Sequence, residues 1–237
     1  MQPRFPHPEP FNLAGKSFTA DEIIAVLSEY LTEDRRAKIA RVVAGRTYSV
    51  VPVLEGLFDR GNVSAVVRSA EAMGCQSLHV IETAKKFKKA IRVTQGAEKW
   101  LDLTTWQATA PCVTWLRDRG YRIAAAHVED ATPITEVSFA EPTALFFGNE
   151  HDGLSSELLD TADVRVAVPM SGFTQSYNIS VAAALAFYHI TRDRTDRLGA
   201  HGDLTEHEQR CLTASYYLRC VDYAEHLFSD TRKEASP

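Results

Sequence analysis

The sequence predicts an α/β protein in which a mainly parallel sheet is covered by helices on both faces. Short apolar runs that are partly β-branched, such as residues 144–147 and 164–168, are typical of strands buried on both faces. These runs alternate with segments of helical period, which is the pattern of parallel strands joined by helices. With 237 residues and 45% hydrophobic content, the chain can form one domain with a sizeable core and short extensions at its ends.

Residues 1–47 are predicted to form an arm and a short helical extension. The stretch 1–17 is Pro-rich and lacks periodicity, so we expect a flexible or draped arm. A Thr-x-x-Glu capping-box pattern opens an amphipathic helix over 19–30, and a second helix is expected over 33–43.

Residues 48–197 carry the strand and helix alternation and are predicted to form the main domain. Strands are expected at 48–55, 78–81, 121–126, 144–147 and 164–168. Helices are expected at 62–73, at 103–119, after Ser155 and from Ile179 onward, and 83–97 is expected to be a polar loop. Pro52 would remove a ladder hydrogen bond, so the first strand is expected at an edge or at a bulge.

Residues 198–237 are predicted to form a C-terminal helical extension. A second capping-box pattern, at Thr205 and Glu208, opens an apolar-periodic segment that runs to Phe228.

The cysteines and the apolar runs bear on location and on metal binding. The four cysteines have no C-x-x-C spacing and no His nearby in ligand register, so we expect reduced structural thiols and no metal. No apolar run approaches about 20 residues, and the N-terminus has no hydrophobic signal core. We therefore expect a cytoplasmic protein that does not cross a membrane.

The net charge of −5 argues at first against a nucleic-acid partner, but the charge is unevenly distributed. Residues 1–100 carry 15 Lys and Arg against 11 Asp and Glu, whereas residues 101–237 carry 11 against 20. Three basic clusters stand out: Arg35, Arg36, Lys38 and Arg41 with Arg46; Lys85, Lys86, Lys88, Lys89 and Arg92; and Arg192, Arg194 and Arg197. Such clusters are usually solvated surface, but beside an RNA site they would contact phosphates.

The stretch 143–190 has an unusual density of motifs. Its first strand ends in GNEHDG, with glycines at 148 and 153, and its second strand leads into PMSGFTQSYNIS at 169–180. Gly-rich turns after strands are common in any α/β domain, so the glycines alone do not indicate a ligand site. An upstream segment, GNVSAVVRSAEAMG at 61–74, carries a third pattern.

These three motifs, in this order, resemble the signature motifs of the SPOUT methyltransferases, and specifically of the TrmH family of RNA ribose 2′-O-methyltransferases. The resemblance covers residues 48–194. It implies a deep trefoil knot near the C-terminal end of the domain, S-adenosylmethionine as the cofactor, and a homodimer. The helices over 179–190 and 204–228 are the candidate interfaces, although the second could simply pack on its own chain.

The resemblance also implies site residues. The expected cofactor-binding residues are Ala126, Gly148, Asn149, Glu150, Val168, Met170, Ser176, Tyr177 and Asn178. The expected catalytic residues are Asn62, Arg68, Glu150, Ser176 and Asn178. The expected RNA-binding residues are Arg35, Arg36, Lys38, Arg41, Lys85, Lys86, Lys88 and Lys89. Tyr177 and Ile179 stand where the family usually has Leu and Val.

Arg68 falls on the arginine that is essential in the family. Family descriptions make this residue the base that takes the 2′-hydroxyl proton, but a guanidinium is effectively always charged. Arg68 could instead clamp a phosphate and stabilise the developing alkoxide, with Glu150 fixing it by a charge-assisted bond. By spacing alone it would be a surface arginine paired with Glu55 or Glu71.

The resulting functional hypothesis is a tRNA ribose 2′-O-methyltransferase, most like the enzymes that modify guanosine 18 of the D-loop. Only about 47 residues precede the predicted domain, whereas the ribosomal relatives carry a globular RNA-binding domain there. The alternatives are a ribosomal RNA or wobble-position tRNA 2′-O-methyltransferase, and a non-catalytic RNA-binding protein on the same fold. A nucleotide-binding metabolic enzyme is disfavoured because both G-x-G-x-x-G and G-x-x-x-x-G-K-[ST] are missing.

Overall fold

The chain divides into two compact units. A computed structural model describes residues 2, 4–57, 59–82 and 96–229. One unit, here the sheet unit, comprises Met1–Arg4 and Arg46–Asp203; the other, the helical unit, comprises Phe5–Gly45 and Leu204–Pro237. Most of each predicted extension therefore belongs to the helical unit, in which helices from the two ends of the chain pack together, whereas residues 1–4, 46–47 and 198–203 belong to the sheet unit.

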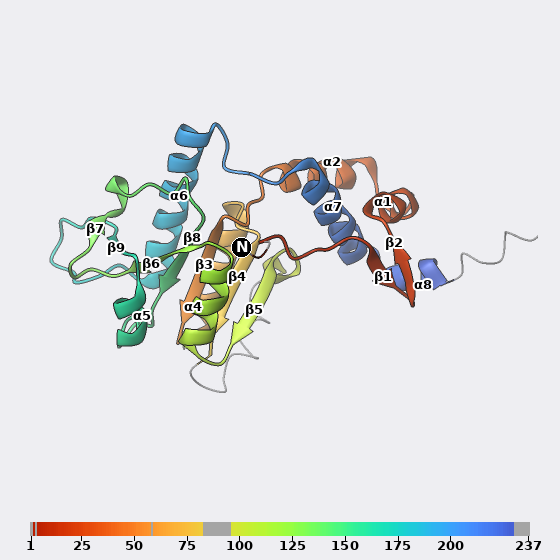
Figure 1. Cartoon of the computed structure of the whole chain (residues 1–237). Coiled ribbons are helices and arrows are strands. Elements are labelled where there is room, and N and C mark those ends of the chain that lie inside the picture. Colours follow the sequence, from red (N-terminus) through yellow and green to blue (C-terminus); the bar gives the residue numbers. More distant parts are fainter. Residues whose placement is uncertain (1, 3, 58, 83–95, 230–237) are drawn as a thin grey trace, which may run out of the picture. The chain divides into compact units, whose positions relative to one another are not determined.

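The sheet unit is built on a seven-stranded parallel sheet in the order β5-β4-β3-β8-β6-β9-β7 (Figure 1). Its strands are β3 (Val50–Glu55), β4 (Ser77–Ile81), β5 (Asp102–Trp106), β6 (Arg122–Ala126), β7 (Thr132–Pro133), β8 (Thr143–Phe147) and β9 (Val164–Ala167). All the predicted strands are present, and the parallel α/β fold class is confirmed.

Helices cover both faces of this sheet, as predicted. The helices are α3 (Arg60–Ala72), α4 (Thr109–Asp118), α5 (Ser156–Thr161) and α6 (Ile179–Leu198), with short 3₁₀ turns η3 (Ala97–Lys99) and η4 (Ile134–Glu136). Helices α3 and α6 pack together over one hydrophobic cluster, whereas α4 and α5 cover the cluster on the opposite face (Figure 1). Both clusters draw on β3 and β8, whose side chains alternate between the two faces.

Strand β3 lies at the centre of the sheet, so the expectation of an edge position is wrong. It pairs with β8 along Val50 to Leu54, and Pro52 lies opposite Leu145. On its other side the pairing with β4 shifts from Thr47 opposite Cys75 to Val53 opposite His79, which leaves two extra residues on the β3 side. The predicted bulge is thus present, and it lets a residue without an N–H sit in an internal strand.

The helix expected over residues 103–119 is wrong in its first part. Residues 102–106 form β5, which extends the sheet beyond β4, and only Thr109–Asp118 is helical. The segment LTTW contains β-branched and aromatic residues that suit a half-buried strand, and the available edge of β4 decided its conformation. The expected loop over 83–97 lies almost entirely outside the described residues.

The helical unit consists of α1 (Ala20–Ser28), α2 (Glu33–Ala44), α7 (Glu206–Cys220), α8 (Ala224–Ser229) and a hairpin of β1 (Phe11–Leu13) with β2 (Lys16–Phe18). Both predicted capping boxes are present, at the starts of α1 and α7. The hairpin corrects the expectation of a flexible arm. Ala14 and Gly15 both have positive φ, which is the conformation of a tight two-residue hairpin turn.

All four cysteines are free, as expected. The statement that no His stands in ligand register is wrong, because His207 and Cys211 are four residues apart on α7. In the described part of the chain, these two and Glu9 hold potential ligand atoms within 4.8 Å of one another. Cys211 Sγ lies 3.7 Å from His207 Nε2, whereas Glu9 Oε2 lies 3.6 Å from His207 Nδ1. Cys211 and Glu9 therefore face different nitrogens of the His207 ring. The absence of a metal stays a prediction.

Across the described residues, none of the helices is both long and apolar enough to cross a bilayer.

Stability at mildly acidic pH should depend on His79, which is fully buried in β4. Its Nδ1 accepts a hydrogen bond from Trp106 Nε1 at 3.1 Å, and burial, with a smaller effect of Arg119, lowers its pKa to about 4. A lowered native pKa stabilises the fold above the unfolded value of about 6.5 and loses that contribution as pH falls toward 4. We expect the unfolding free energy to drop by about 2 kcal/mol from this group between pH 8 and pH 5.

Urea unfolding at the two pH values measures this effect. His79→Gln, which keeps an acceptor for Trp106, should lower the pH dependence by that amount. An unchanged dependence in the variant would assign it to other groups.

Candidate functional site

The turn after β8 is shaped by its two glycines. A Cβ on Gly148 would lie 2.1 Å from the carbonyl carbon of Gly153, so no side chain fits there, and Gly153 has φ +69°. Asn149 and Gly153 exchange both backbone hydrogen bonds at 3.1 Å. The Asn149 Oδ1 accepts from the backbone N–H groups of His151 and Asp152 at 2.8 and 2.7 Å, which closes the turn from inside. The motif therefore builds a compact, backbone-rich wall at the carboxyl end of β8.

A second wall comes from the loop between β9 and α6. Residues 171–178 are exposed, and Tyr177 Oη donates to the Pro169 carbonyl at 3.4 Å. Asn178 is the N-cap of α6, because its Oδ1 accepts from the N–H and hydroxyl of Ser180 at 2.9 and 2.6 Å.

Asn62 connects these two walls. Its Nδ2 donates to Glu150 in the turn, and its Oδ1 accepts from Asn178 Nδ2 at 3.2 Å. Asn62 lies in the first turn of α3, whose N-cap Asp59 accepts from the Asn62 backbone N–H at 2.8 Å. Three segments that are far apart in sequence, and that carry the three motifs, therefore meet in one hydrogen-bonded chain. Asn62, Glu150 and Asn178 are three of the five predicted catalytic residues.

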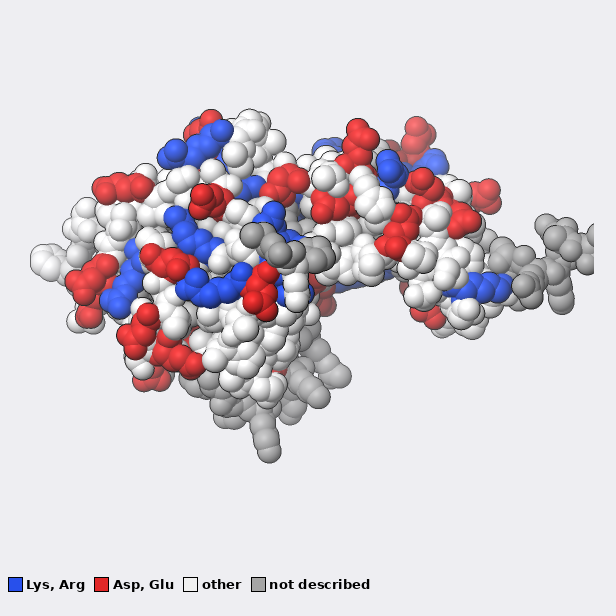
Figure 2. Space-filling model, viewed as in Figure 1, with Lys and Arg blue, Asp and Glu red and all other residues white. Residues whose placement is uncertain are grey.

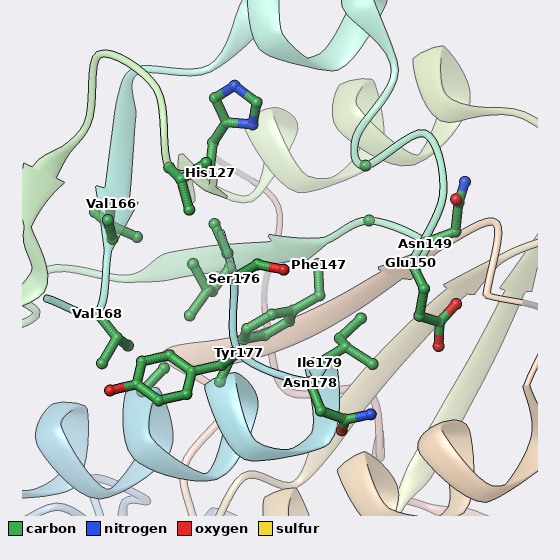
Figure 3. Close-up of a pocket in the computed structure, with 18 of the residues that line it drawn as sticks. His127, Phe147, Asn149, Glu150, Val166, Val168, Ser176, Tyr177, Asn178 and Ile179 are labelled. Carbon is green, nitrogen blue, oxygen red and sulfur yellow. The ribbon is translucent and has the colours of Figure 1, made fainter. Parts of the chain in front are cut away.

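A pocket of about 550 Å³ lies between the walls, at the carboxyl ends of β6, β8 and β9 (Figure 3). All nine predicted cofactor-binding residues line it, including Ser176, the fourth predicted catalytic residue. Sequence reasoning missed several further lining residues: His127, Val128, Ile134, Leu145, Phe147, His151, Asp152, Gly153, Val166, Ala167, Ile179, Ala182 and Ala186. Many of these residues lie at the end of a predicted strand or directly after it. Because parallel strands bring their carboxyl ends to one edge of the sheet, selecting the residues at those strand ends would have identified them.

The lining combines an apolar floor with a few polar groups. Phe147, Val166 and Ile179 contribute apolar surface, and Figure 3 shows Asn149 and Glu150 on the opposite side of the pocket from Val166 and Val168. The described residues of the lining include the carboxylates of Glu150 and Asp152 but no Lys or Arg. A pocket of this size and charge suits a small organic ligand with a positive group.

The structure does not bring Arg68 into this pocket. Arg68 is exposed on α3, and in the described part of the chain it forms no ion pair, so the expected bond to Glu150 is absent. Glu150 binds Asn62 instead. Arg68 is six residues beyond Asn62, roughly 9 Å along the helix axis and on a different side. Its alternative partners are also engaged elsewhere, since Glu71 pairs with Arg46 and Glu55 is buried.

The predicted basic clusters differ from one another in their exposure to solvent. Arg35, Arg36, Lys38 and Arg41 are all exposed on α2, and Lys85, Lys86, Lys88 and Lys89 lie outside the described residues. The expectation of phosphate contact is wrong for Arg46 and Arg194, which are each 1% exposed and pair with Glu71 and Asp203. Both guanidiniums also donate to backbone carbonyls. The spacing of the charges had indicated surface residues, whereas in the fold both arginines are buried and connect separate segments of the chain.

A parallel sheet with a largely apolar pocket at the carboxyl ends of its strands defines an α/β protein that binds a small organic ligand. The sequence model of the SpoU rRNA Methylase family matches residues 49–188, more than half of the chain. The chain therefore belongs to the SpoU rRNA Methylase family, and the resemblance drawn from its motifs is confirmed.

Individual proteins of known identity agree with this assignment. The chain is 36% identical to a tRNA (guanosine(18)-2′-O)-methyltransferase of Borreliella burgdorferi, over 84% of this chain and 91% of that protein. It is similar to the crystal structure of the A. aeolicus TrmH/SpoU tRNA modifying enzyme, with a TM-score of 0.71 and 27% identity over 80% of this chain and 98% of that one. It is also similar to the SpoU methyltransferase AviRb from Streptomyces viridochromogenes in complex with AdoMet, with a TM-score of 0.56 and 27% identity over 61% and 57% of the two chains.

Gly148→Ala should disrupt the turn, because the added Cβ meets the Gly153 backbone and neither segment can yield without opening the wall. We expect a loss of unfolding free energy of about 2 kcal/mol or more, measured by chemical denaturation. Gly172→Ala is the matched control, since its Cβ would come no closer than 3.9 Å to another atom. That variant should stay within about 0.5 kcal/mol of the unmodified protein. Equal losses in both variants would mean that the close approach at Gly148 is not what the turn requires.

Proposed function

We propose that the protein transfers a methyl group from S-adenosylmethionine to the 2′-hydroxyl of guanosine 18 in the D-loop of tRNA. The observation that carries this proposal is the convergence of the three motifs on one pocket, with Asn62, Glu150 and Asn178 hydrogen-bonded at its rim. The tRNA substrate and the nucleotide are taken from the relatives, such as the Borreliella burgdorferi protein. A tRNA substrate also supports a cytoplasmic location.

The residues of the pocket fit the cofactor. S-adenosylmethionine supplies an electrophilic methyl group on a positively charged sulfonium. The carboxylates of Glu150 and Asp152 would favour that charge, and the apolar surfaces of Phe147 and Ile179 would contact the adenosine. The backbone of Gly148 and of the exposed loop before Asn178 would read the polar edges of the ligand, because both line the pocket.

The network at the rim would position the ribose. Displacement at the methyl carbon needs the 2′-oxygen held in line with the bond that breaks, and orientation supplies much of the rate. The amide of Asn62 is fixed by two hydrogen bonds from opposite sides, so it is a rigid element for this purpose. Ser176 lines the pocket and has a hydroxyl, while Asn178 is held by its own capping bonds.

Arg68 is proposed to act as a charge clamp on the substrate rather than as the base. It is exposed, and its distance along α3 from Asn62 suits the phosphate next to the reacting ribose better than the 2′-hydroxyl itself. A guanidinium there stabilises the negative charge that develops as the 2′-oxygen loses its proton.

Helix α2 is proposed to contact the tRNA backbone through Arg35, Arg36, Lys38 and Arg41. In the view of Figure 2, Lys and Arg of the described residues are interspersed with Asp and Glu on each unit. We propose that contact depends on such local groups, and on Lys85, Lys86, Lys88 and Lys89, which lie outside the described residues, more than on the net charge.

We further propose that the protein is a homodimer and that its C-terminal segment is knotted, as the family resemblance implies. Support for the dimer comes from α6, on which Val181, Leu185 and Tyr188 are 45%, 40% and 57% exposed. Their spacing of four and three residues places them in one stripe. Such an apolar stripe on the N-terminal half of α6 suits a self-complementary contact. Residues 48–197 are proposed to be the catalytic domain, flanked by the two extensions.

Incubation with labelled S-adenosylmethionine and unmodified tRNA transcript, followed by mapping of the methylated nucleotide, tests the proposal. We expect 2′-O-methylguanosine at position 18. Label in ribosomal RNA fragments instead would move the substrate to the alternative, and binding of tRNA without any label would favour a non-catalytic protein.

In the same assay, Arg68→Ala should lose turnover by about 100-fold or more while keeping the affinity for S-adenosylmethionine, because Arg68 does not line the pocket. Arg68→Lys should keep only a small part of the activity if the contact is bidentate. Near-normal turnover in Arg68→Ala would remove this residue from the catalytic set.

Leu185→Glu should convert the dimer to a monomer, because it buries a charge in the centre of the stripe. Leu198→Glu is the control, since Leu198 is 50% exposed on the same helix but on another side. Sedimentation velocity measures the mass of each. A monomeric unmodified protein, or a dimer that survives Leu185→Glu, would contradict the proposed interface.

A further inference from the structure

A buried carboxylate lies directly behind the pocket wall. Glu55 is the last residue of β3 and is 4% exposed, although it is absent from the predicted site and from the lining of the pocket. Within the described part of the chain it forms no ion pair. Burying an unpaired carboxylate is costly unless hydrogen bonds satisfy it, so its surroundings call for an explanation.

Three donors surround this carboxylate. Ser155 donates twice, from its backbone N–H to Oε2 at 2.9 Å and from its hydroxyl to Oε1 at 2.7 Å, and Thr109 Oγ1 also donates to Oε1. Ser155 is the N-cap of α5, and its Oγ accepts from the Leu158 N–H at 3.3 Å, so its hydroxyl is used as both donor and acceptor. Glu55 therefore ties the start of α5, and less directly the start of α4, to the end of the central strand.

Ser155 is the point at which the pocket-lining turn rejoins the fold. The turn of residues 148–153 leaves β8 at Phe147, and it is followed by Leu154, which is 5% exposed in a hydrophobic cluster, and then by Ser155. One end of the turn is thus fixed by the β3–β8 ladder and the other by the Glu55 carboxylate.

Glu55 also stands at the start of the segment that carries Asn62. The chain passes from Glu55 through Gly56, whose φ is +65° and whose N–H donates to the Ile81 carbonyl at 3.1 Å, into α3. The Glu55 carboxylate is therefore a further contact between the segment that bears Asn62 and the segment that bears Glu150, in addition to the hydrogen bond between those two residues at the rim.

We propose that Glu55 is a positioning residue of the methyl-transfer site. Its hydrogen bonds with Ser155 hold the 148–153 turn in the conformation that binds S-adenosylmethionine, and they keep Glu150 in contact with Asn62. This inference rests on the proposed function of the pocket. It differs from a purely structural role, in which Glu55 would only seal two helix ends and stabilise the fold.

Glu55→Gln and Thr109→Val separate the two roles. In Glu55→Gln, an amide that accepts from the Ser155 N–H must turn its NH₂ group toward two hydroxyls, whose hydrogens then lack an acceptor. Thr109→Val removes one bond to the same carboxylate but leaves both bonds from Ser155. A role limited to stability predicts similar behaviour in the two variants, whereas a positioning role predicts that only Glu55→Gln affects the pocket.

The experiment measures S-adenosylmethionine affinity by calorimetry, turnover at saturating cofactor, and the thermal midpoint, all on the full chain. We expect Glu55→Gln to weaken cofactor binding by about tenfold and to lower turnover, and Thr109→Val to stay within about twofold in both. Amide hydrogen exchange at Ser155 should accelerate in Glu55→Gln alone. Should Glu55→Gln unfold, Ser155→Ala, which keeps the backbone bond, is expected to give a smaller loss of affinity in the same direction.

The inference fails if the unmodified protein binds the cofactor and both variants bind it with the same affinity. It also fails if both variants lose affinity to the same extent and in proportion to the drop in their thermal midpoints. If the unmodified protein binds no S-adenosylmethionine, the proposed function fails first. The two failures are therefore distinguishable.

Discussion

The parallel ladder between β3 and β8 is the interaction on which the rest of the structure depends. It runs from Val50 opposite Thr143 to Leu54 opposite Phe147 and joins two strands from distant parts of the chain. Because the strands are parallel, their carboxyl ends finish side by side, and the segments that follow them leave the sheet at the same edge. The GNVSAVVR segment and the GNEHDG turn are thereby brought together before any side chain at the rim contributes.

Polar contacts then fix the relative positions of the segments that the β3–β8 ladder brings together. At the rim, Asn62 hydrogen-bonds to both Glu150 and Asn178, and behind the wall Glu55 binds Ser155. Such contacts are directional, so they determine geometry in a way that apolar packing does not. The buried Arg194 plays the same kind of part elsewhere, because it joins the carbonyl of Phe139 to the carboxylate of Asp203.

The pocket combines a floor of core residues with an exposed loop. Its floor is formed by strand ends and by the first turns of α6, all parts of the packed core, whereas the loop of residues 171–178 is exposed. A rigid floor with an exposed loop above it lets part of the ligand surface be covered by backbone groups. Gly148 is the extreme case, since the approach of Gly153 leaves space for backbone alone.

The sequence by itself determined the fold class, the positions of five strands and both capping boxes, because periodicity and caps are local patterns. Through the family that its motifs resemble, it also indicated nine residues that line the pocket. It could not determine which neighbours those residues would have. Residues 103–106 became a strand because β4 offered an edge, and Arg194, which stands in a surface-like run of charges, became buried because Asp203 and two carbonyls surround it. Glu55 gave no signal in the sequence beyond a charge at the end of a strand, and Arg68 stayed outside the pocket because helix geometry turns it away from Asn62. Burial and partner choice are properties of the assembled core, so only the tertiary structure decided them.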